Sequence, residues 1–330
     1  MTKVEKEIND QRNELEKIYT FMKKKVEKEE IGHFLKDADI VYFVGCGSSY
    51  YLGISASRYF TLKTGIETKA IPGGEIVFAE SANVSGKLKK AAVLISRSGE
   101  STEVVIAAEK FKRMGVPTLG VTLEEESSLA RSSDEKLVIP VIEESIVMTK
   151  GFSSTLLSLQ LLTDRLAGDL NASIYEEILS KVSEQIDAAY EEIIRERLFE
   201  GKHYVFLGTG VYEGLARESA LKLEEMSLAK TEAYSTFEYR HGPKALVEEG
   251  FVITIFRGGE KEERKEEEKL KKELESYGGK VIFREKLTDE PEDAFLRIVF
   301  SQILALKIAE KKGVDVERPR NLTKVVVLKN

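Results

Sequence analysis

Three ionisable residues between positions 211 and 228 have the types and the spacing needed for acid–base chemistry. Glu218, Lys222 and Glu225 are spaced i, i+4 and i+7, so a helix carries them on one stripe. Apolar residues flank this stripe on both sides: Leu215, Leu221, Met226 and Leu228. An inward-facing row of carboxylate, ammonium and carboxylate can move protons at a carbon next to a carbonyl or imine. The alternative is an ordinary salt-bridge ladder along a helix, which is common.

A second group of polar residues lies in the stretch 93–102, VLISRSGEST. An apolar run ends there in Ser96, Arg97, Ser98 and Ser101, and helical spacing of apolar residues begins after Thr102. Hydroxyls, free backbone N–H groups at a helix start and one guanidinium suit a phosphate group. A Ser/Thr cluster that caps the helix would give the same pattern, so both interpretations stay open.

These residues need a scaffold of strands that alternate with helices. The stretch IVYFVGCGSSYYLGISASRYF is predicted to be a strand, a Gly/Ser turn and a helix, in that order. Further strands are predicted at 67–71, 91–95, 117–122 and 137–141, with helical stretches between several of them. A charged helix is predicted up to about Asp39, and residues 153–200 are helical without a strand pattern. This alternation predicts an α/β fold with a doubly wound parallel sheet.

The second half of the chain repeats the first. HYVFLGTGVYEGLA resembles IVYFVGCGSSYYLG, with Gly208 matching Gly45, and GFVITIFRGGE resembles AAVLISRSGES at nearly the same offset. Two similar α/β halves are therefore expected. Arg257, Gly258 and Gly259 stand where the first half has its serines, so phosphate binding is expected in the first half alone.

Two further residues have chemistry that the sequence leaves open. His241 lies in a Gly/Pro loop, FEYRHGPKALVEEG, where histidines are often ordinary surface residues. Lys324 precedes an apolar, strand-like run in RPRNLTKVVVLKN, and lysines that flank strands are common.

Composition restricts the class of protein. The 330 residues include 42% apolar residues and carry a net charge of −7, which argues against a nucleic-acid partner. One cysteine, Cys46, fits a reducing compartment, and three dispersed histidines argue against a His-based metal site. We find neither a membrane-length apolar stretch nor an apolar signal core, so we expect a soluble cytoplasmic protein.

Four segments in the same order resemble one known family: GCGSSYYLG, LISRSGES, ARESALKLEEMSLAKTEAYSTFEYRHGPKALV and RPRNLTK. From about residue 5 to 330 the chain resembles the isomerase portion of glucosamine-6-phosphate synthase. The resemblance implies two tandem sugar-isomerase (SIS) domains, each a flavodoxin-like, three-layer αβα domain. It divides the chain into an N-terminal helix (1–39), a first SIS domain (40–170), a connecting helix (171–200), a second SIS domain (201–316) and a tail with Lys324 (317–330).

The resemblance also implies a role for each candidate residue. Ser48, Ser49, Ser96, Ser98 and Ser101 would hold the sugar phosphate, with Arg97 beside them. Glu225 would shuttle a proton between C1 and C2, and Lys222 and Glu218 would tune charge next to it. Lys324 would form an imine with the open-chain ketose, and His241, donated by the other subunit of a homodimer, would promote ring opening. The family chemistry implies no metal and no organic cofactor.

Three departures from the family pattern shape the functional hypothesis. The synthases' glutaminase domain is absent from this sequence, which indicates a deaminase rather than a glutamine-dependent aminotransferase. Arg97 replaces a glutamine, which would strengthen or crowd the phosphate site, and Met148 replaces a serine near the sugar.

We therefore expect isomerising deamination of glucosamine 6-phosphate to fructose 6-phosphate and ammonia. Three alternatives remain: a deaminase of another amino sugar phosphate of the fructosamine type, an ammonia-dependent synthase, and a sugar-phosphate sensor without catalysis.

Overall fold

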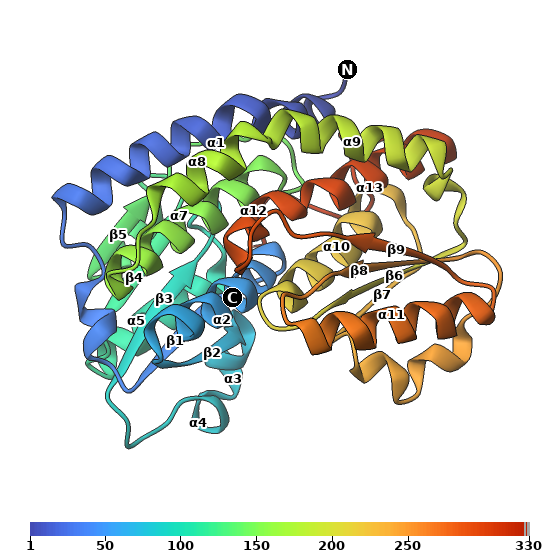
Figure 1. Ribbon diagram of the computed structural model, residues 1–330. Coiled ribbons are helices and arrows are strands. Elements are labelled where there is room, and N and C mark those ends of the chain that lie inside the picture. The colour runs from blue at the N-terminus through green and yellow to red at the C-terminus, as the bar shows by residue number, and fades with distance from the viewer. Residues whose placement is uncertain (327, 329–330) are drawn as a thin grey trace. The chain divides into compact units, whose positions relative to one another are not determined.

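The computed structural model describes residues 1–326 and 328, in which the chain forms two compact units (Figure 1). The five-stranded unit holds residues 13–144, 150–172 and the described part of 323–330. The four-stranded unit holds residues 1–12, 145–149 and 173–322. Each unit contains one sheet whose strands are all parallel. The α/β class predicted from the sequence is thus confirmed.

The first sheet has the strand order β2-β1-β3-β4-β5. Its strands are β1 (Ile40–Gly45), β2 (Glu67–Pro72), β3 (Lys90–Ile95), β4 (Thr118–Thr122) and β5 (Glu135–Val138). Every residue of β1 and β4 is buried, as expected for central strands covered on both faces. The predicted strands are confirmed, although β5 begins and ends slightly earlier than expected.

Helices cover both faces of this sheet. Tyr42, Val44 and Leu94 share a core with α5 (Thr102–Arg113), which also takes in residues of α3 (Gly73–Phe78) and α6 (Ser128–Ser132). On the other face, α2 (Ser48–Thr64) lies against Phe43 and Ile95 and packs on α7 (Lys150–Ala167). The short helix α4 spans Glu80–Asn83. The five-stranded unit therefore has three layers, helix, sheet and helix.

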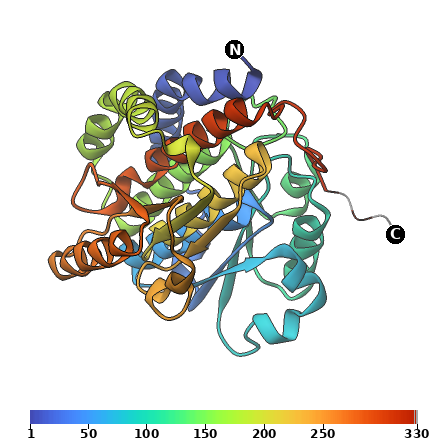
Figure 2. The same ribbon diagram turned by 90° about the vertical axis from the view of Figure 1, so that its right-hand side faces the viewer.

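The second sheet has the order β7-β6-β8-β9, formed by β6 (His203–Gly208), β7 (Thr231–Tyr234), β8 (Phe251–Phe256) and β9 (Lys280–Arg284). Helix α10 (Tyr212–Ser227) packs on β6 and β7, and α13 (Val299–Lys312) packs on α10. Leu270 and Leu274 of α11 (Lys261–Ser276) join the core of the other face. Figure 2 shows α11 (orange) and α13 (red) on opposite sides of the golden strands.

The remaining helices account for the predicted helical stretches with one correction. Helix α1 (Lys3–Lys28) buries an apolar stripe formed by Ile8, Leu15, Ile18 and Met22. The prediction of a helix up to about Asp39 is wrong beyond Lys28, because Gly32 adopts a left-handed conformation (φ 72°) and a 3-10 turn, η1 (His33–Asp37), follows.

Helices α8 (Ala172–Ser180), α9 (Val182–Arg195) and α12 (Ala294–Arg297) complete the fold, and residues 153–200 contain no strand. Among the helices of residues 1–326, not one has both the length and the apolar character that a membrane crossing requires.

Candidate functional site

Two strand-to-helix turns meet at the carboxyl edge of the first sheet. Strands β1 and β3 are neighbours, and the helices that follow them, α2 and α5, cover opposite faces. A sheet with the order 2-1-3-4-5 has its topological switch point between these two strands, and open α/β folds bind ligands at that point. The predicted serines follow these strands: Ser48 and Ser49 begin α2, and Ser96, Ser98 and Ser101 lie between β3 and α5.

The turn after β3 requires a glycine at its centre. Gly99 has a positive φ of 65°, and a Cβ there would lie 2.1 Å from Ser127 Oγ. Ser101 is the N-cap residue of α5, but in the described structure its side chain makes no capping hydrogen bond. Instead, the Ser96 hydroxyl donates to Ser101 Oγ at 3.3 Å. Helix capping, the alternative explanation for these serines, therefore does not account for Ser101.

The turn after β1 brings the helix unusually close to the strand end. A Cβ on Gly45 would lie 2.5 Å from the backbone carbonyl carbon of Ser49, so only glycine fits. Ser49 is buried and Ser48 is half-buried. Gly208 has the same constraint at the end of β6, where a Cβ would lie 2.2 Å from the backbone oxygen of Tyr212. The predicted match between Gly45 and Gly208 thus has a structural basis.

The acidic and basic row of α10 is buried in the four-stranded unit. The side chains of Glu218 and Lys222 are fully buried and form an ion pair, with 3.4 Å between Lys222 Nζ and Glu218 Oε1. Lys222 also donates to Glu225, whose side chain is 19% exposed. The ion pairs of the salt-bridge alternative are therefore present, but they lie on a buried face of the helix rather than on a solvated one. Glu225 is the member that solvent, and hence a ligand, can reach.

One flank of this row differs from the prediction. Leu215 and Met226 are fully buried, as expected. Leu228 is 47% exposed, because α10 ends at Ser227 and Leu228 adopts a left-handed conformation with φ 51°. The expectation that Leu228 forms an apolar flank is wrong.

The other predicted site residues lie as follows. His241 is exposed and follows the 3-10 turn η3 (Glu238–Arg240), next to Gly242 with φ 136°. Met148 is buried in the four-stranded unit. Lys324 is exposed as a residue, and its ammonium donates to the backbone oxygen of Glu143 at 2.7 Å. Among residues 323–326 and 328 we find no strand, so the strand-like run after Lys324 is not confirmed, and Val327 lies outside the described residues.

Arg97 lies against a carboxylate rather than in an open pocket. Its Nη1 is 3.0 Å from Glu143 Oε2, and the Glu143 side chain is fully buried. Its Nη2 donates to the backbone oxygen of Lys324 at 3.3 Å. Sequence reasoning missed Glu143. The signal that could have found it is its place after β5, at the same carboxyl edge of the sheet as the serines. An arginine that has little access to water at that edge requires a carboxylate to balance its charge.

The predicted residues thus fall into two groups. The five-stranded unit brings together the serine turns, Arg97 and Lys324. The four-stranded unit holds the row Glu218, Lys222 and Glu225, and His241.

The corresponding edge of the second sheet is filled by the protein itself. Glu267 of α11 is fully buried, and it accepts from the Gly258 backbone N–H at 2.9 Å and from Arg257 Nε at 3.3 Å. Burial raises the pKa of this carboxyl group, and the Gly258 N–H lowers it in part. An internal carboxylate therefore occupies the turn that, in the first half, carries the serines.

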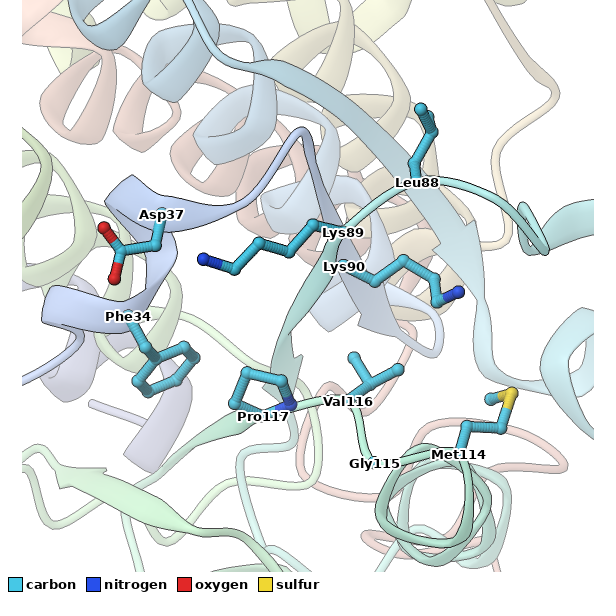
Figure 3. A pocket seen from close by; sticks show the side chains of 9 residues that line it. All are labelled: Phe34, Asp37, Leu88, Lys89, Lys90, Met114, Gly115, Val116 and Pro117. Carbon is cyan, nitrogen blue, oxygen red and sulfur yellow. The ribbon is translucent and has the colours of Figure 1, made fainter.

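A separate hollow of about 320 Å³ lies at the opposite edge of the first sheet (Figure 3). It is lined by residues that precede β3 and β4, including Lys89 and Pro117, and by Phe34 and Asp37 of η1. Figure 3 shows the Lys89 side chain pointing toward Asp37. This hollow contains none of the serines and is not the candidate site.

Comparison with known proteins agrees with this architecture. The SIS domain model matches residues 34–165. A crystal structure of a glucosamine-6-phosphate deaminase from Thermotoga maritima is 41% identical, with a TM-score of 0.89, over 99% of this chain and 100% of that chain. The C-terminal domain of a glucosamine-fructose-6-phosphate aminotransferase from Francisella tularensis has the same fold, at 24% identity and a TM-score of 0.83 over 96% of this chain and 98% of that one.

The curated relatives are longer proteins. A glutamine–fructose-6-phosphate aminotransferase (isomerizing) from Aquifex aeolicus is 30% identical over 315 residues, which cover 89% of this chain and 52% of the relative. The chain spans about half the length of such relatives. The SIS match at the serine-bearing sheet, together with 41% identity over the whole length of the Thermotoga maritima structure, establishes that the chain belongs to the SIS-domain family.

Proposed function

We propose that this chain is an isomerising deaminase that converts glucosamine 6-phosphate to fructose 6-phosphate and ammonia. The observation that carries the proposal is the buried row of α10, in which Glu225 is the one member with a partly exposed side chain. A carboxylate held next to a buried ammonium can accept a proton and return it within one turnover. Similarity to the Thermotoga maritima deaminase along the whole chain supports the choice of reaction.

The serine turns would bind the phosphate group. Hydroxyls of Ser48, Ser49, Ser96, Ser98 and Ser101 and the start of α5 gather at one switch point. Hydroxyl donors together with the positive end of a helix favour a dianion. The carboxylate of Glu267 at the equivalent edge of the second sheet supports a single phosphate site for each chain.

Proton transfer would then proceed on the open-chain sugar. Glu225 removes the proton from C2 of the 2-amino aldose, and the electron pair moves to the C1 carbonyl oxygen, which gains a proton. The resulting enolamine takes the proton back at C1, which leaves an imine at C2. During these steps the Lys222 ammonium would stabilise the carboxylate of Glu225, and Glu218 would balance the charge of Lys222.

Ammonia would leave from C2 in the last stage. Either water adds to the imine and ammonia departs, or the Lys324 amine adds first, expels ammonia and forms its own imine, which water hydrolyses. Both routes give fructose 6-phosphate and ammonia, and hydrolysis of the lysine imine in the second route regenerates the free Lys324 amine.

We further propose that both units are SIS domains in tandem and that the chain acts as a homodimer. The shared strand order at the start of each sheet and the paired constraints at Gly45 and Gly208 support the tandem arrangement. His241, exposed and next to Gly242, would act in the site of the other subunit to open the sugar ring. Mixing His241→Asn with Glu225→Gln subunits should restore activity that each variant lacks, whereas no restoration would place both residues in one subunit's site.

The test of the proposed reaction is product analysis with purified protein and no glutamine. Glucosamine 6-phosphate should give ammonia and fructose 6-phosphate in equal amounts. Preference for another 6-phosphorylated amino sugar would change the substrate, and net synthesis from fructose 6-phosphate and ammonia would favour the reverse direction. Binding of these sugar phosphates without turnover would identify a sensor and refute the enzyme proposal.

A further inference from the structure

Glu143 and Arg97 form a buried ion pair that has no role in the proton transfer described above. The Glu143 side chain is fully buried and that of Arg97 is 11% exposed. Besides Arg97, the carboxylate accepts the backbone N–H of Gly151 at 2.8 Å, in the first turn of α7. The pair therefore links the turn after β3, the segment after β5 and the start of α7.

The same two residues contact Lys324 at its backbone oxygen and at its side-chain amine. Arg97 Nη2 donates to the Lys324 backbone oxygen at 3.3 Å, and Lys324 Nζ donates to the Glu143 backbone oxygen at 2.7 Å. Farther along, the Thr102 N–H points at the Val326 oxygen at 3.5 Å, and the Leu328 N–H donates to Thr102 Oγ1 at 3.1 Å. These contacts join the exposed segment of residues 324–326 and 328 to the five-stranded unit, at a chain terminus of the kind that is poorly ordered unless it is bound in this way.

We propose that Glu143 and Arg97 are positioning residues that hold the C-terminal segment so that the Lys324 amine stays at the carboxyl edge of the first sheet. A lysine side chain is flexible, and a reaction at its amine is fast only when the amine is held near the reacting carbon. The guanidinium does this through the backbone, since it binds the Lys324 carbonyl oxygen while Glu143 balances its charge.

This role differs from the phosphate contact expected for Arg97 from the sequence. If Arg97 bound the phosphate group, it would set the affinity for the sugar phosphate and hence KM. A positioning residue would set the rate at which Lys324 forms its imine, with KM nearly unchanged. The imine part of the inference rests on the proposed function, whereas the position of the segment does not.

Gly151 offers a perturbation that touches neither Arg97 nor Lys324. A Cβ at this position would lie 2.8 Å from Glu143 Oε2, and its three nearest neighbours are all atoms of the Glu143 carboxylate. The variant Gly151→Ala should therefore fold and displace only that carboxylate, since alanine is favourable in a helix. Gly74→Ala, in the first turn of α3 with nothing within 4 Å of its Cβ, is the matched control.

The first readout is proteolysis and requires no activity. Trypsin cleaves after Lys324 and after Arg320, and both residues are exposed, but Arg320 belongs to the four-stranded unit and serves as an internal reference. Relative to Arg320, cleavage after Lys324 should be about five-fold faster or more in Gly151→Ala and in Glu143→Gln, and unchanged in Gly74→Ala. Equal cleavage in all variants would overturn the inference, even for a protein without activity.

The second readout is trapping of the lysine imine. Borohydride delivers hydride to the imine carbon formed from Lys324 and fructose 6-phosphate, which leaves a stable secondary amine that mass spectrometry locates. Trapping should be slowed about ten-fold or more in Gly151→Ala, with KM within about two-fold of the wild type. A raised KM with unchanged trapping would make Arg97 a phosphate ligand instead. Absence of both the imine and ammonia in the wild type would count against the proposed function, while the cleavage ratio still decides the position of the segment.

Discussion

Replacing Lys222 by methionine tests the buried row directly. The ammonium lies between two carboxylates, and both Lys222 and Glu218 have fully buried side chains. Methionine has a similar length and no charge, so Lys222→Met leaves the Glu218 carboxylate buried without its cation. Removing one partner from a buried ion pair costs about 3–5 kcal/mol, and solvent screening does not reduce this cost because neither side chain is exposed.

This cost should be visible in thermal unfolding. For units of this size, about 1 kcal/mol shifts Tm by about 2–4 °C, so the transition of the four-stranded unit should fall by about 6–20 °C. The double variant Glu218→Met/Lys222→Met removes both buried charges and should recover most of the loss. Calorimetry is the suitable assay because the two units can unfold in separate transitions.

The dependence on pH has a defined sign. Without the Lys222 cation beside it, the buried Glu218 carboxylate favours its protonated form more strongly, so Lys222→Met should lose stability as the pH rises and regain it as the pH falls. The difference from the wild type should therefore be smaller at pH 5 than at pH 7. A loss below about 1 kcal/mol at pH 7 that does not vary with pH would refute the conclusion that these charges are buried together.

Two further predictions concern the carboxyl edges of the sheets. Gly45→Ala and Gly208→Ala both introduce contacts shorter than any real Cβ contact, at 2.5 Å and 2.2 Å, so both should lower stability. Only Gly45→Ala should weaken fructose 6-phosphate binding, by about ten-fold or more in calorimetric titration; equal effects on binding would contradict the single phosphate site. Burial, with the charge of Glu103 as a smaller cause, raises the pKa of the Cys46 thiol from 9.0 to about 11. Alkylation of this thiol by iodoacetamide at pH 8 should therefore be about a hundred-fold slower than in the urea-unfolded chain. Comparable rates would show that the thiol is not buried.

Much of the scaffold was predictable because it depends on local patterns. Central strands of a parallel sheet are mostly continuous apolar runs, and the five strands of the first sheet lie near their predicted positions. Strand β7 was not predicted, because it is short and only half-buried. The spacing of Glu218, Lys222 and Glu225 predicted a common face, and the apolar flanks favoured burial, which the structure confirms for the first two. Leu228 was misplaced because the left-handed residue that ends α10 is not glycine, so the usual helix-stop signal is missing.

Long-range pairings were not predictable from spacing. Glu143 follows β5 in an acidic pair, and its ion-pair partner Arg97 lies 46 residues away in sequence. The carboxylate of Glu267 was not predictable because α11 is rich in charged residues, yet Glu267 itself is fully buried. The division of the chain into two units depends on contacts between distant segments in the same way.

The central claim is that Glu225 transfers the proton between C1 and C2 of an amino sugar phosphate. The neighbouring Glu224 is exposed on the same helix and provides a matched control. The measurement is the rate of ammonia and fructose 6-phosphate release from glucosamine 6-phosphate by the wild type, Glu225→Gln and Glu224→Gln. We predict a loss of about 10²–10⁴-fold in Glu225→Gln with an unchanged fold, and a rate in Glu224→Gln within about two-fold of the wild type. Ammonia release by Glu225→Gln at close to the wild-type rate would contradict the proposed mechanism.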